Sequence, residues 1–368
     1  MKILYITTIG VTMGFFESFI KEQLDIGNQI DIATNENDGK TSVPSCYREW
    51  GCKIYHLDTS RSPVSLGNIR AIKQIRELVN RNHYDMVHCH TPLAAAATRM
   101  ACKHFRKHGL KVVYTAHGFH FYNGASLKNW LIYYPIEKIL SKYTDILITI
   151  NKEDYKRAST SFHAQKTVYV PGVGIDTNKF ALGTLNREKI RTELKINDNQ
   201  TMLLSVGELN ENKNHENVIK AISGIKNLIY VIVGKGVLKE HLKLIAEEFN
   251  VEVKLVGFRS DVADFYQAAD IYILPSIREG LNVSLMEAMA ASLPCLAGKI
   301  RGNVDLLDEK GEELFNPSSC DEIRHAIKKI LALTAKERKN KGECNLKTIR
   351  LFDKKIINAS LFEIYQEI

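Results

Sequence analysis

The sequence predicts an α/β protein with two doubly wound domains, in each of which helices cover a parallel sheet. Short apolar runs alternate with amphipathic segments from end to end, which is typical of parallel strands joined by crossover helices. At 368 residues, of which 45% are hydrophobic and 25% charged, the chain is long enough for two cores. The alternation pauses at the Pro/Gly segment 171–175, which is the best linker candidate.

Seven apolar runs before this linker predict the strands of a first sheet, and the segments between them carry apolar residues at helical spacing. The expected strands are Ile3–Thr7, Gln29–Ala33, Lys53–His56, Met86–His90, Val112–Ala116, Ile146–Ile150 and Val168–Val170. The expected helices are Phe15–Ile26, Ser65–Val79, Ala94–Lys107, Ser126–Lys142 and Glu153–Ser161.

A second alternating set follows the linker and predicts a second sheet. Its expected strands are Met202–Val206, Tyr230–Val233, Val253–Val256, Ile271–Leu274 and Pro294–Ala297. Its expected helices are Asn214–Ile222, Leu238–Glu248, Ala263–Ala268, Val283–Ala291 and Ile323–Leu333. Ligands of such sheets bind beyond the carboxyl ends of the strands, so we expect the functional residues in the loops that follow the strands.

Composition limits the compartment and the class of protein. The seven cysteines are odd in number and include no C-x-x-C pair, which favours a reducing cytoplasm over a disulfide framework or a zinc site. No stretch approaches eighteen uninterrupted apolar residues, and Met1-Lys2 leads straight into an apolar strand without a basic leader. We therefore expect a cytoplasmic protein with neither a membrane span nor a secretion signal.

The net positive charge of the chain lies in its first half. Residues 1–175 hold 22 Lys and Arg against 14 Asp and Glu, whereas the remainder holds 28 against 28. Many of these basic residues fall on two stretches, Arg70 to Arg81 and Arg99 to Lys111. Such a face suits nucleic acid, anionic lipid or a polyanionic substrate, or is simply solvated. Because no RNA-binding or recognition-helix motif is present, we expect no nucleic-acid partner.

Two glutamates, Glu279 and Glu287, stand eight residues apart in the run LPSIREGLNVSLMEAMAASLPCLAG, which predicts a strand, a turn and a helix. Gly280, Leu281 and Asn282 place backbone N–H groups at the helix start, where a phosphate is favoured. One carboxylate can then hold sugar hydroxyls and the other a ribose, with a diphosphate between them. A strand-helix unit with one capping and one solvated glutamate explains the same pattern.

This run resembles the E-x7-E signature of retaining glycosyltransferases with the GT-B fold, family 4. Other similar segments follow in the same order, among them MKILYITTIGVTMGFF, HCHTP, TAHGFHFYNG, PGVGIDTNKF, LLSVGELNENKNHENVIKAI, VIVGKG and VKLVGFRSDVADFYQAADIYILPS. The segment around residues 115–145 also looks like enzymes of capsular and exopolysaccharide assembly. The resemblance implies two Rossmann-like domains facing across a cleft: an acceptor-side domain, 1–172, a nucleotide-sugar domain, 173–351, and a final helix, about 352–368, that packs back on the first domain.

The resemblance also implies roles for individual residues. Glu279, His117 and Lys213 would be the catalytic residues: Glu279 on the donor sugar, His117 near its reacting carbon and Lys213 on the diphosphate. The donor-binding residues would be Glu287, Gly280, Leu281, Asn282, Val283, Gly257, Phe258, Arg259 and Gly207. Many relatives carry an Arg where this chain has Glu208, so Lys213 would share the diphosphate charge with Arg278, Arg301 or main-chain donors.

On the acceptor side, related enzymes often carry two adjacent glycines in the first loop, whereas this chain has Gly14 followed by Phe15. We therefore expect Gly14, Phe15 and Phe16 to face the acceptor. His120 and Tyr122, which follow His117 in the HG-type loop, are expected there too. The stretch from Trp130 to Tyr134 lies among Lys128, Lys138 and Lys142, which suits a membrane interface or a lipid-diphosphate acceptor, or a buried helix face.

The histidines also suggest a metal, because His88 and His90 alternate on one strand and His117 and His120 are three apart. We disfavour this interpretation, since no Asp or Glu completes such a site and the resemblance implies metal-independent transfer, with no cofactor besides the donor substrate.

The resulting hypothesis is a retaining transferase that moves a hexose or N-acetylhexosamine from a UDP-sugar to a lipid-linked acceptor of the undecaprenyl-diphosphate type, on the anionic inner face of the cell membrane. A UDP-sugar 2-epimerase with the same fold, or a non-catalytic peripheral membrane or polysaccharide-binding protein, are the alternatives.

Overall fold

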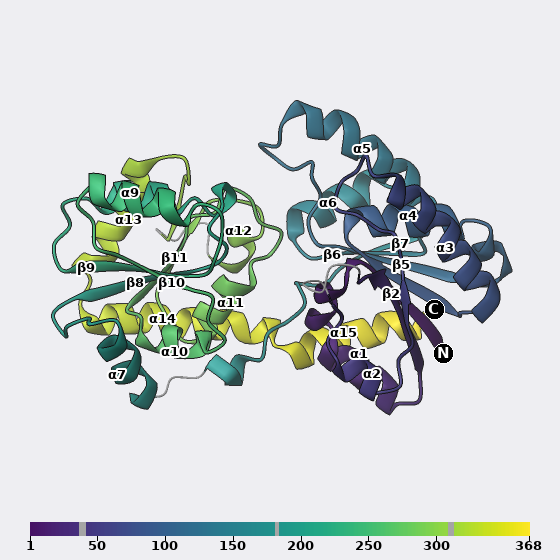
Figure 1. Cartoon of the computed structure of the whole chain (residues 1–368), viewed down its shortest axis with the longest axis horizontal. Coiled ribbons are helices and arrows are strands. Elements are labelled where there is room, and N and C mark those ends of the chain that lie inside the picture. Colours follow the sequence, from purple (N-terminus) through teal and green to yellow (C-terminus); the bar gives the residue numbers. More distant parts are fainter. Residues whose placement is uncertain (37–41, 181–183, 308–312) are drawn as a thin grey trace. The chain divides into compact units, whose positions relative to one another are not determined.

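The computed structural model describes residues 1–36, 42–180, 184–307 and 313–368. The chain forms two compact units (Figure 1). The first consists of Met1–Val173 together with Ile357–Ile368, and the second of Gly174–Ile356.

Within the described residues, the first unit is built on a seven-stranded parallel sheet in the order β3-β2-β1-β4-β5-β6-β7. Its strands are β1 (Lys2–Ile9), β2 (Gln29–Asn35), β3 (Ile54–His56), β4 (Met86–His90), β5 (Lys111–Ala116), β6 (Ile146–Thr149) and β7 (Lys166–Tyr169). The strand order reverses between β1 and β4, and ligands of doubly wound sheets bind at such a switch point.

Helices cover both faces of this sheet (Figure 1). They are α1 (Glu17–Asp25), α2 (Cys46–Glu49), α3 (Leu66–Asn82), α4 (Pro92–Cys102), α5 (Leu127–Ser141), α6 (Lys152–Ser161) and, from the end of the chain, α15 (Lys354–Gln366). Ile357, Ile364 and Tyr365 of α15 lie in the same buried cluster as Phe19 and Ile20 of α1. The final helix is therefore part of the core of the first unit.

The second unit has a six-stranded parallel sheet in the order β10-β9-β8-β11-β12-β13, again counted over the described residues. The strands are β8 (Thr201–Val206), β9 (Leu228–Val233), β10 (Val253–Gly257), β11 (Ile271–Leu274), β12 (Cys295–Gly298) and β13 (Leu314–Phe315). The helices are α7 (Thr184–Glu193), α8 (His215–Ile222), α9 (Lys239–Glu248), α10 (Val262–Ala268), α11 (Val283–Ala290), α12 (Asn303–Leu306), α13 (Cys320–Ala332) and α14 (Ala335–Ile349). The switch point of this sheet lies between β8 and β11.

The predicted α/β class with two doubly wound sheets is confirmed. Each of the twelve expected strands forms, with both ends within two residues of the expected positions. Strand β11 is flanked by β8 and β12 and is buried throughout, which explains its uninterrupted apolar sequence.

Two expected helices are shortened next to 3₁₀ turns, and two others extend three residues beyond the expected ends, α3 to Asn82 and α13 back to Cys320. Gly10–Phe15 forms a 3₁₀ helix (η1), so the α-helix expected from Phe15 begins at Glu17. The helix expected over Ala94–Lys107 ends at Cys102, because a separate 3₁₀ turn (η2) occupies Phe105–His108. Both segments carried apolar residues at helical spacing, and that spacing does not separate a 3₁₀ turn from the α-helix next to it.

Candidate functional site

The first group of predicted site residues lies at the carboxyl edge of the second sheet. Lys213 follows β8 in a 3₁₀ turn (η4, Glu211–Lys213), and Glu279 follows β11, the neighbouring strand. The Nζ of Lys213 donates to Oε1 of Glu279 across 2.7 Å, and both side chains are largely buried, with 16% and 14% exposed. The structure therefore brings these two residues, 66 positions apart, into one ion pair.

The loop that carries Glu279 is held by its neighbours. Arg301, from the loop after β12, donates through Nε to the main-chain oxygen of Glu279 over 3.2 Å. Gly302 has a φ of +81°, and a Cβ there would lie 2.1 Å from the main-chain oxygen of Gly280. Any other residue at 302 would push the loop of Gly280 away from this edge, so the glycine is required by close backbone approach.

Helix α11 starts directly after this loop. Asn282 is its N-cap: its Oδ1 accepts from the N–H of Leu285 at 3.0 Å and from the hydroxyl of Ser284 at 2.6 Å. The predicted donor-binding side chain of Asn282 is thus engaged in capping. Leu281 and Val283 pack against the core of the second unit. A ligand at this segment would therefore contact its main chain and the positive end of the helix dipole.

Glu287 lies one turn from the start of α11 and is held by Tyr266 of α10. The Tyr266 hydroxyl lies 2.9 Å from Oε2 of Glu287 and 3.1 Å from the main-chain oxygen of Ser284. Burial raises the pKa of Glu287, while the Tyr266 hydroxyl and the positive charges of Lys179 and Lys354 oppose that rise. Tyr266 fixes one carboxylate oxygen and fits a role in orienting Glu287.

The remaining predicted donor residues have different surroundings. Gly207 directly follows β8, and a Cβ there would lie 3.1 Å from Cε of Lys213, so the lysine side chain lies along its backbone. Gly257 ends β10, and Phe258 is exposed with Nζ of Lys235 5.5 Å from its ring centre. Arg259 pairs with both Glu193 and Asp261, so its guanidinium has local partners.

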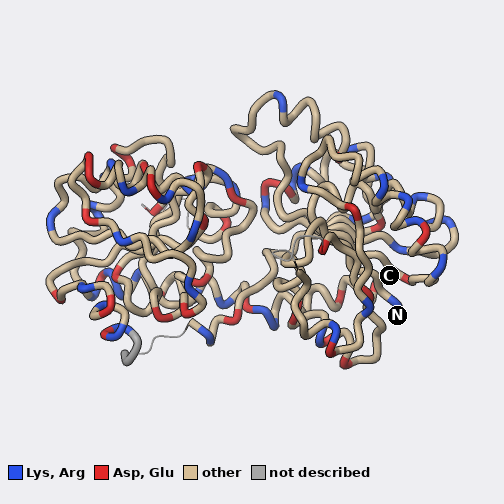
Figure 2. The backbone as a smooth tube through the Cα atoms, viewed as in Figure 1, with Lys and Arg blue, Asp and Glu red and all other residues tan. Residues whose placement is uncertain are grey.

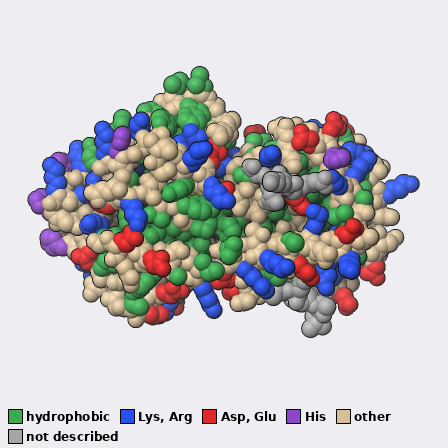
Figure 3. Space-filling view, turned by 180° about the vertical axis from the view of Figure 1, so that it is seen from behind, with side chains coloured by type: hydrophobic (Ala, Val, Ile, Leu, Met, Phe, Trp, Pro, Cys, Tyr) green, Lys and Arg blue, Asp and Glu red, His purple; other side chains and the backbone are tan. Residues whose placement is uncertain are grey.

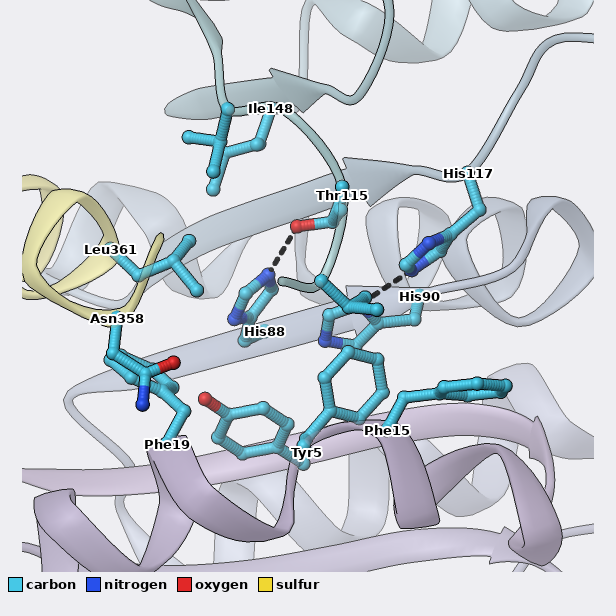
Figure 4. Close-up of a pocket in the computed structure, with 14 residues that line it drawn as sticks. Tyr5, Phe15, Phe19, His88, His90, Thr115, His117, Ile148, Asn358 and Leu361 are labelled. Carbon is cyan, nitrogen blue, oxygen red and sulfur yellow. Dashed lines mark hydrogen bonds between the residues drawn. The ribbon is translucent and has the colours of Figure 1, made fainter. Parts of the chain in front are cut away.

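The second group of predicted residues lies in the first unit, where histidines from β4 and the loop after β5 converge (Figure 4). His90 Nδ1 is 3.1 Å from His117 Nε2. His88 Nε2 is 2.8 Å from Oγ1 of Thr115, and His88 Nδ1 is 2.5 Å from the hydroxyl of Tyr365. These contacts form because His88 and His90 alternate along β4, so both face the side of the sheet covered by α1 and α15.

The hollow beside these rings is small and mostly apolar, with a volume of about 20 Å³ and a lining that includes Phe15, Phe16 and Leu361. Burial lowers the pKa of His88 to about 3 and that of His117 to about 4, and it lowers the pKa of His90 well below its ordinary value. At neutral pH all three rings are therefore uncharged, and each has one N–H donor and one bare nitrogen.

The five predicted acceptor residues do not form one cluster. Phe15 is half exposed at the mouth of the hollow and Phe16 is buried against His90, while Gly14 is exposed outside it. His120 instead stacks on Tyr133 of α5, with ring centres 4.6 Å apart. Tyr122 follows in the same loop and is partly buried.

The structure separates the two faces of α5. Its aromatic residues Trp130, Tyr133 and Tyr134 pack against the core of the first unit, as the buried-face interpretation required. Leu140 is also buried, whereas five other large apolar residues of α5 are exposed and lie between the exposed Lys128 and Lys142 or beside them (Figure 3, top of the view). They are Leu127, Leu131, Ile132, Ile136 and Ile139. We call these five residues the α5 apolar face.

The basic stretches of the first unit behave differently from one another. Arg70, Lys73, Arg76 and Arg81 of α3 are exposed, and Figure 2 shows this charge along α3. Arg99 of α4 was expected on the same basic face, but that prediction is wrong. Its side chain is 1% exposed, forms an ion pair of 2.8 Å with Glu137 of α5 and lies 4.4 Å from the ring centre of Tyr114.

In the described part of the chain, no three His, Cys, Asp or Glu side chains are arranged so that they could hold a metal ion. Within the same ranges no helix has the length and apolar character needed to cross a membrane.

Sequence reasoning missed three residues of these clusters: Tyr266, Thr115 and Tyr365. Thr115 has a usable signal, because it alternates with His117 at the end of an expected strand. Tyr365 contacts His88 across 277 positions, and no local pattern indicates that contact.

The fold of the chain matches those of solved structures. The crystal structure of HepE from Anabaena in complex with UDP has a TM-score of 0.83 against this chain, with 18% identity over 100% of both chains. Sucrose-phosphate synthase from Thermosynechococcus elongatus has a TM-score of 0.82 with 17% identity, covering 100% of this chain and 98% of that one. The chain has the GT-B fold, as expected.

Sequence comparison identifies the family. The family model described as "Glycosyl transferase 4-like" matches residues 2–151, and the model "Glycosyl transferases group 1" matches residues 186–345. EpsD of Bacillus subtilis strain 168, itself only provisionally named a glycosyltransferase, is 35% identical over 323 residues, or 85% of this chain and 82% of EpsD. The UDP-Gal:alpha-D-GlcNAc-diphosphoundecaprenol alpha-1,3-galactosyltransferase of Escherichia coli is 27% identical over 364 residues, or 94% and 91% of the two chains. The chain belongs to the family 4 glycosyltransferases, and the resemblance inferred from its motifs is confirmed.

Proposed function

We propose that this glycosyltransferase moves a hexose or N-acetylhexosamine from a UDP-sugar, with retention of configuration, to a hydroxyl of a lipid-linked saccharide during polysaccharide assembly. The observation that carries the proposal is the Lys213–Glu279 pair beside the start of α11. An ammonium, a carboxylate and a helix start at one sheet edge match a sugar attached to a diphosphate. The names of relatives support the donor and acceptor classes, since one is a galactosyltransferase acting on a diphosphoundecaprenol-linked sugar and HepE was crystallised with UDP.

In this proposal the second unit binds the donor. Lys213 and the main-chain N–H groups at Gly280 to Asn282 take the diphosphate charge, while Glu279 accepts hydrogen bonds from the sugar hydroxyls. Glu287 accepts from the ribose through the oxygen that Tyr266 does not hold. The main chain at Gly207 and at Gly257 to Arg259 lines the rest of the donor, and His117 of the first unit supports the sugar near its reacting carbon.

No side chain is assigned as a nucleophile. Retention follows if the departing phosphate accepts the proton of the attacking hydroxyl on the same face of the sugar ring. The protein then contributes orientation and charge stabilisation. We propose that transfer needs no metal ion or other cofactor, because the Lys213 ammonium and the helix start supply the positive charge that a divalent cation supplies elsewhere.

We further propose that the enzyme works peripherally at the anionic inner face of the cell membrane. The α5 apolar face carries five exposed Leu and Ile side chains, with exposed lysines at both ends. Such a surface suits partial burial among lipid headgroups. Gly14 and Phe15, with His120 and Tyr122, would then meet the saccharide of a lipid-linked acceptor.

The test is UDP release from a panel of UDP-sugars, with and without an undecaprenyl-diphosphate-linked saccharide. Wild type should release UDP in an acceptor-dependent way, and Glu279→Gln should lower that rate by at least about 100-fold with an unchanged thermal unfolding curve. If a UDP-sugar alone were converted to an isomer, the epimerase would replace this proposal. Lipid binding without UDP release from any donor would favour a non-catalytic binding protein.

A further inference from the structure

The proposed function uses His117 but not His90, which lies against it. His90 is the last residue of β4, it is 2% exposed, and its ring packs between neighbouring rings beside the small hollow. Its centre is 4.2 Å from that of Phe16 and 4.2 Å from that of His88, and its ring lies within 14° of parallel to Tyr5. These contacts come from Phe16, between η1 and α1, from β1 and from β4 itself, and they leave the imidazole of His90 a single orientation.

One hydrogen bond leaves this packed ring, and it goes to His117. Nδ1 of His90 is 3.1 Å from Nε2 of His117, while Nε2 of His90 is buried and has no hydrogen-bond partner among the described residues. Because both rings are neutral, one of the two facing nitrogens carries hydrogen and the other is bare.

The unpartnered nitrogen decides the direction of this bond. If His117 donated, Nδ1 of His90 would be bare and the hydrogen of the His90 ring would lie on Nε2 of His90. That hydrogen would then form a buried N–H group without an acceptor. If His90 donates, only a bare nitrogen is left unpaired. Buried N–H groups without a partner are rarer in proteins than under-satisfied acceptors, so the second arrangement is favoured.

We propose that His90 is a positioning residue for His117: it donates from Nδ1 to Nε2 of His117 and thereby holds that imidazole in one orientation and in the Nδ1–H tautomer. His117 then presents its Nδ1–H as a fixed hydrogen-bond donor. This inference rests on the proposed function only for the role of His117 at the sugar. The tautomer itself is a property of the free protein.

Three substitutions separate this bond from packing. His90→Asn places an amide nitrogen at the position of Nδ1, so it keeps the donor. His90→Gln carries the same amide one carbon further out, and His90→Phe keeps the stacking but has no donor. We expect kcat to fall about 10-fold or more in the Gln and Phe variants and to stay near the wild-type value in the Asn variant. The donor KM should stay within about 2-fold of wild type in all three variants. Equal rates for Asn and Gln would overturn the proposal.

A double-mutant comparison tests whether His90 acts through His117. In a His117→Ala background, His90→Phe should have no further effect on kcat. A second loss of about 10-fold in that background would show an independent role for His90 and refute the inference. If wild type has no transferase activity, or if His117→Ala leaves kcat unchanged, the proposed role of His117 fails instead.

The tautomer can be read without any activity. ¹⁵N chemical shifts distinguish an N–H nitrogen from a bare one, and the His117 signals are assigned by their loss in His117→Gln. We expect wild-type His117 at pH 7 to carry hydrogen on Nδ1 and a bare Nε2, and the His90→Phe variant to show a mixture of tautomers. Hydrogen on Nε2 of His117 in the wild type would contradict the proposal, even if the enzyme is active.

Discussion

Replacing exposed residues of the α5 apolar face should weaken membrane binding without affecting the fold. Leu131 is 69% exposed and Ile139 is 57% exposed, so their removal leaves no cavity. Fully burying a Leu or Ile side chain contributes about 1.5–3 kcal/mol, and these exposed fractions scale the two residues to about 3 kcal/mol together. Leu131→Gln with Ile139→Gln should therefore lower the partition coefficient onto vesicles by about 100-fold.

The assay is sedimentation with vesicles that contain anionic lipid, at two salt concentrations. A matched control exists, because Leu244 of α9 in the second unit is 64% exposed. Leu131→Gln alone should weaken binding by about 10-fold, whereas Leu244→Gln should have no effect. Lys128→Gln with Lys142→Gln should reduce the salt-sensitive part of binding, at about 1 kcal/mol for each lysine.

The outcome that would refute this reasoning is specific. If Leu131→Gln and Leu244→Gln bind vesicles equally, exposed apolar area on α5 is not what holds the protein to lipid. Since both substitutions lie on exposed positions, unchanged thermal unfolding in both variants would rule out misfolding as the explanation.

Three further predictions concern the titratable groups. Lys213→Met leaves the Glu279 carboxylate without its 2.7 Å partner, so kcat/KM for the donor should fall at least about 100-fold and UDP should bind more weakly in calorimetry. Burial raises the pKa of Glu287, so the contribution of this carboxyl group to folding stability is fully present below pH 4.5 and is lost as the pH rises. Glu287→Gln should therefore raise Tm at pH 8 and leave Tm unchanged at pH 4. An equal shift of Tm at both pH values would contradict the buried carboxylate. Burial lowers the pKa of His88 to about 3, so as the pH falls below 6.5 the unfolded chain binds a proton at His88 before the folded chain does, and the free energy of unfolding decreases. In urea unfolding, His88→Gln should reduce this decrease by about 1.4 kcal/mol per pH unit between pH 6 and 4.5. An unchanged slope would count against a neutral His88.

The strands and the donor-side clusters could be predicted because their signals are local. A buried parallel strand is continuously apolar, and the residues just after it must lie at one sheet edge. That rule alone places Lys213 after β8 and Glu279 after β11, and their contact follows because the two strands are neighbours. The sequence did not reveal that β8 and β11 pair; the sheet order of the structure shows it.

Helix α5 shows a structural property that local sequence signals do not predict. Both of its faces are apolar, so helical spacing predicts the helix but not which face is buried. Trp130, Tyr133 and Tyr134 pack against the core and Leu140 is buried, whereas the five aliphatic residues of the α5 apolar face are exposed. Arg99 was misplaced for a related reason: a basic residue at the start of a basic stretch predicts exposure, unless a partner such as Glu137 compensates its burial.

Helix α14 was missed for the opposite reason. Of its fifteen residues only Gly342 and Ile349 are buried, so it has no apolar stripe to detect. The capping box formed by Thr334 and Glu337 was its one available signal. The contact of Tyr365 with His88 had no signal at all, since it depends on where the last helix docks.

The two sites use opposite electrostatics, and the chemistry of transfer gives a reason. The second unit holds a charged pair, Lys213 with Glu279, beside a helix start. In the proposed reaction a diphosphate gains negative charge as it leaves, so the ammonium would favour the transition state over the bound donor. The first unit instead holds His90 and His117 uncharged by burying them. A sugar hydroxyl carries no charge and is oriented by a directional donor, so a neutral imidazole of one tautomer selects geometry where a charged ring would mainly attract anions. If this reasoning holds, raising the salt concentration should weaken donor binding and leave the contribution of His117 to kcat unchanged.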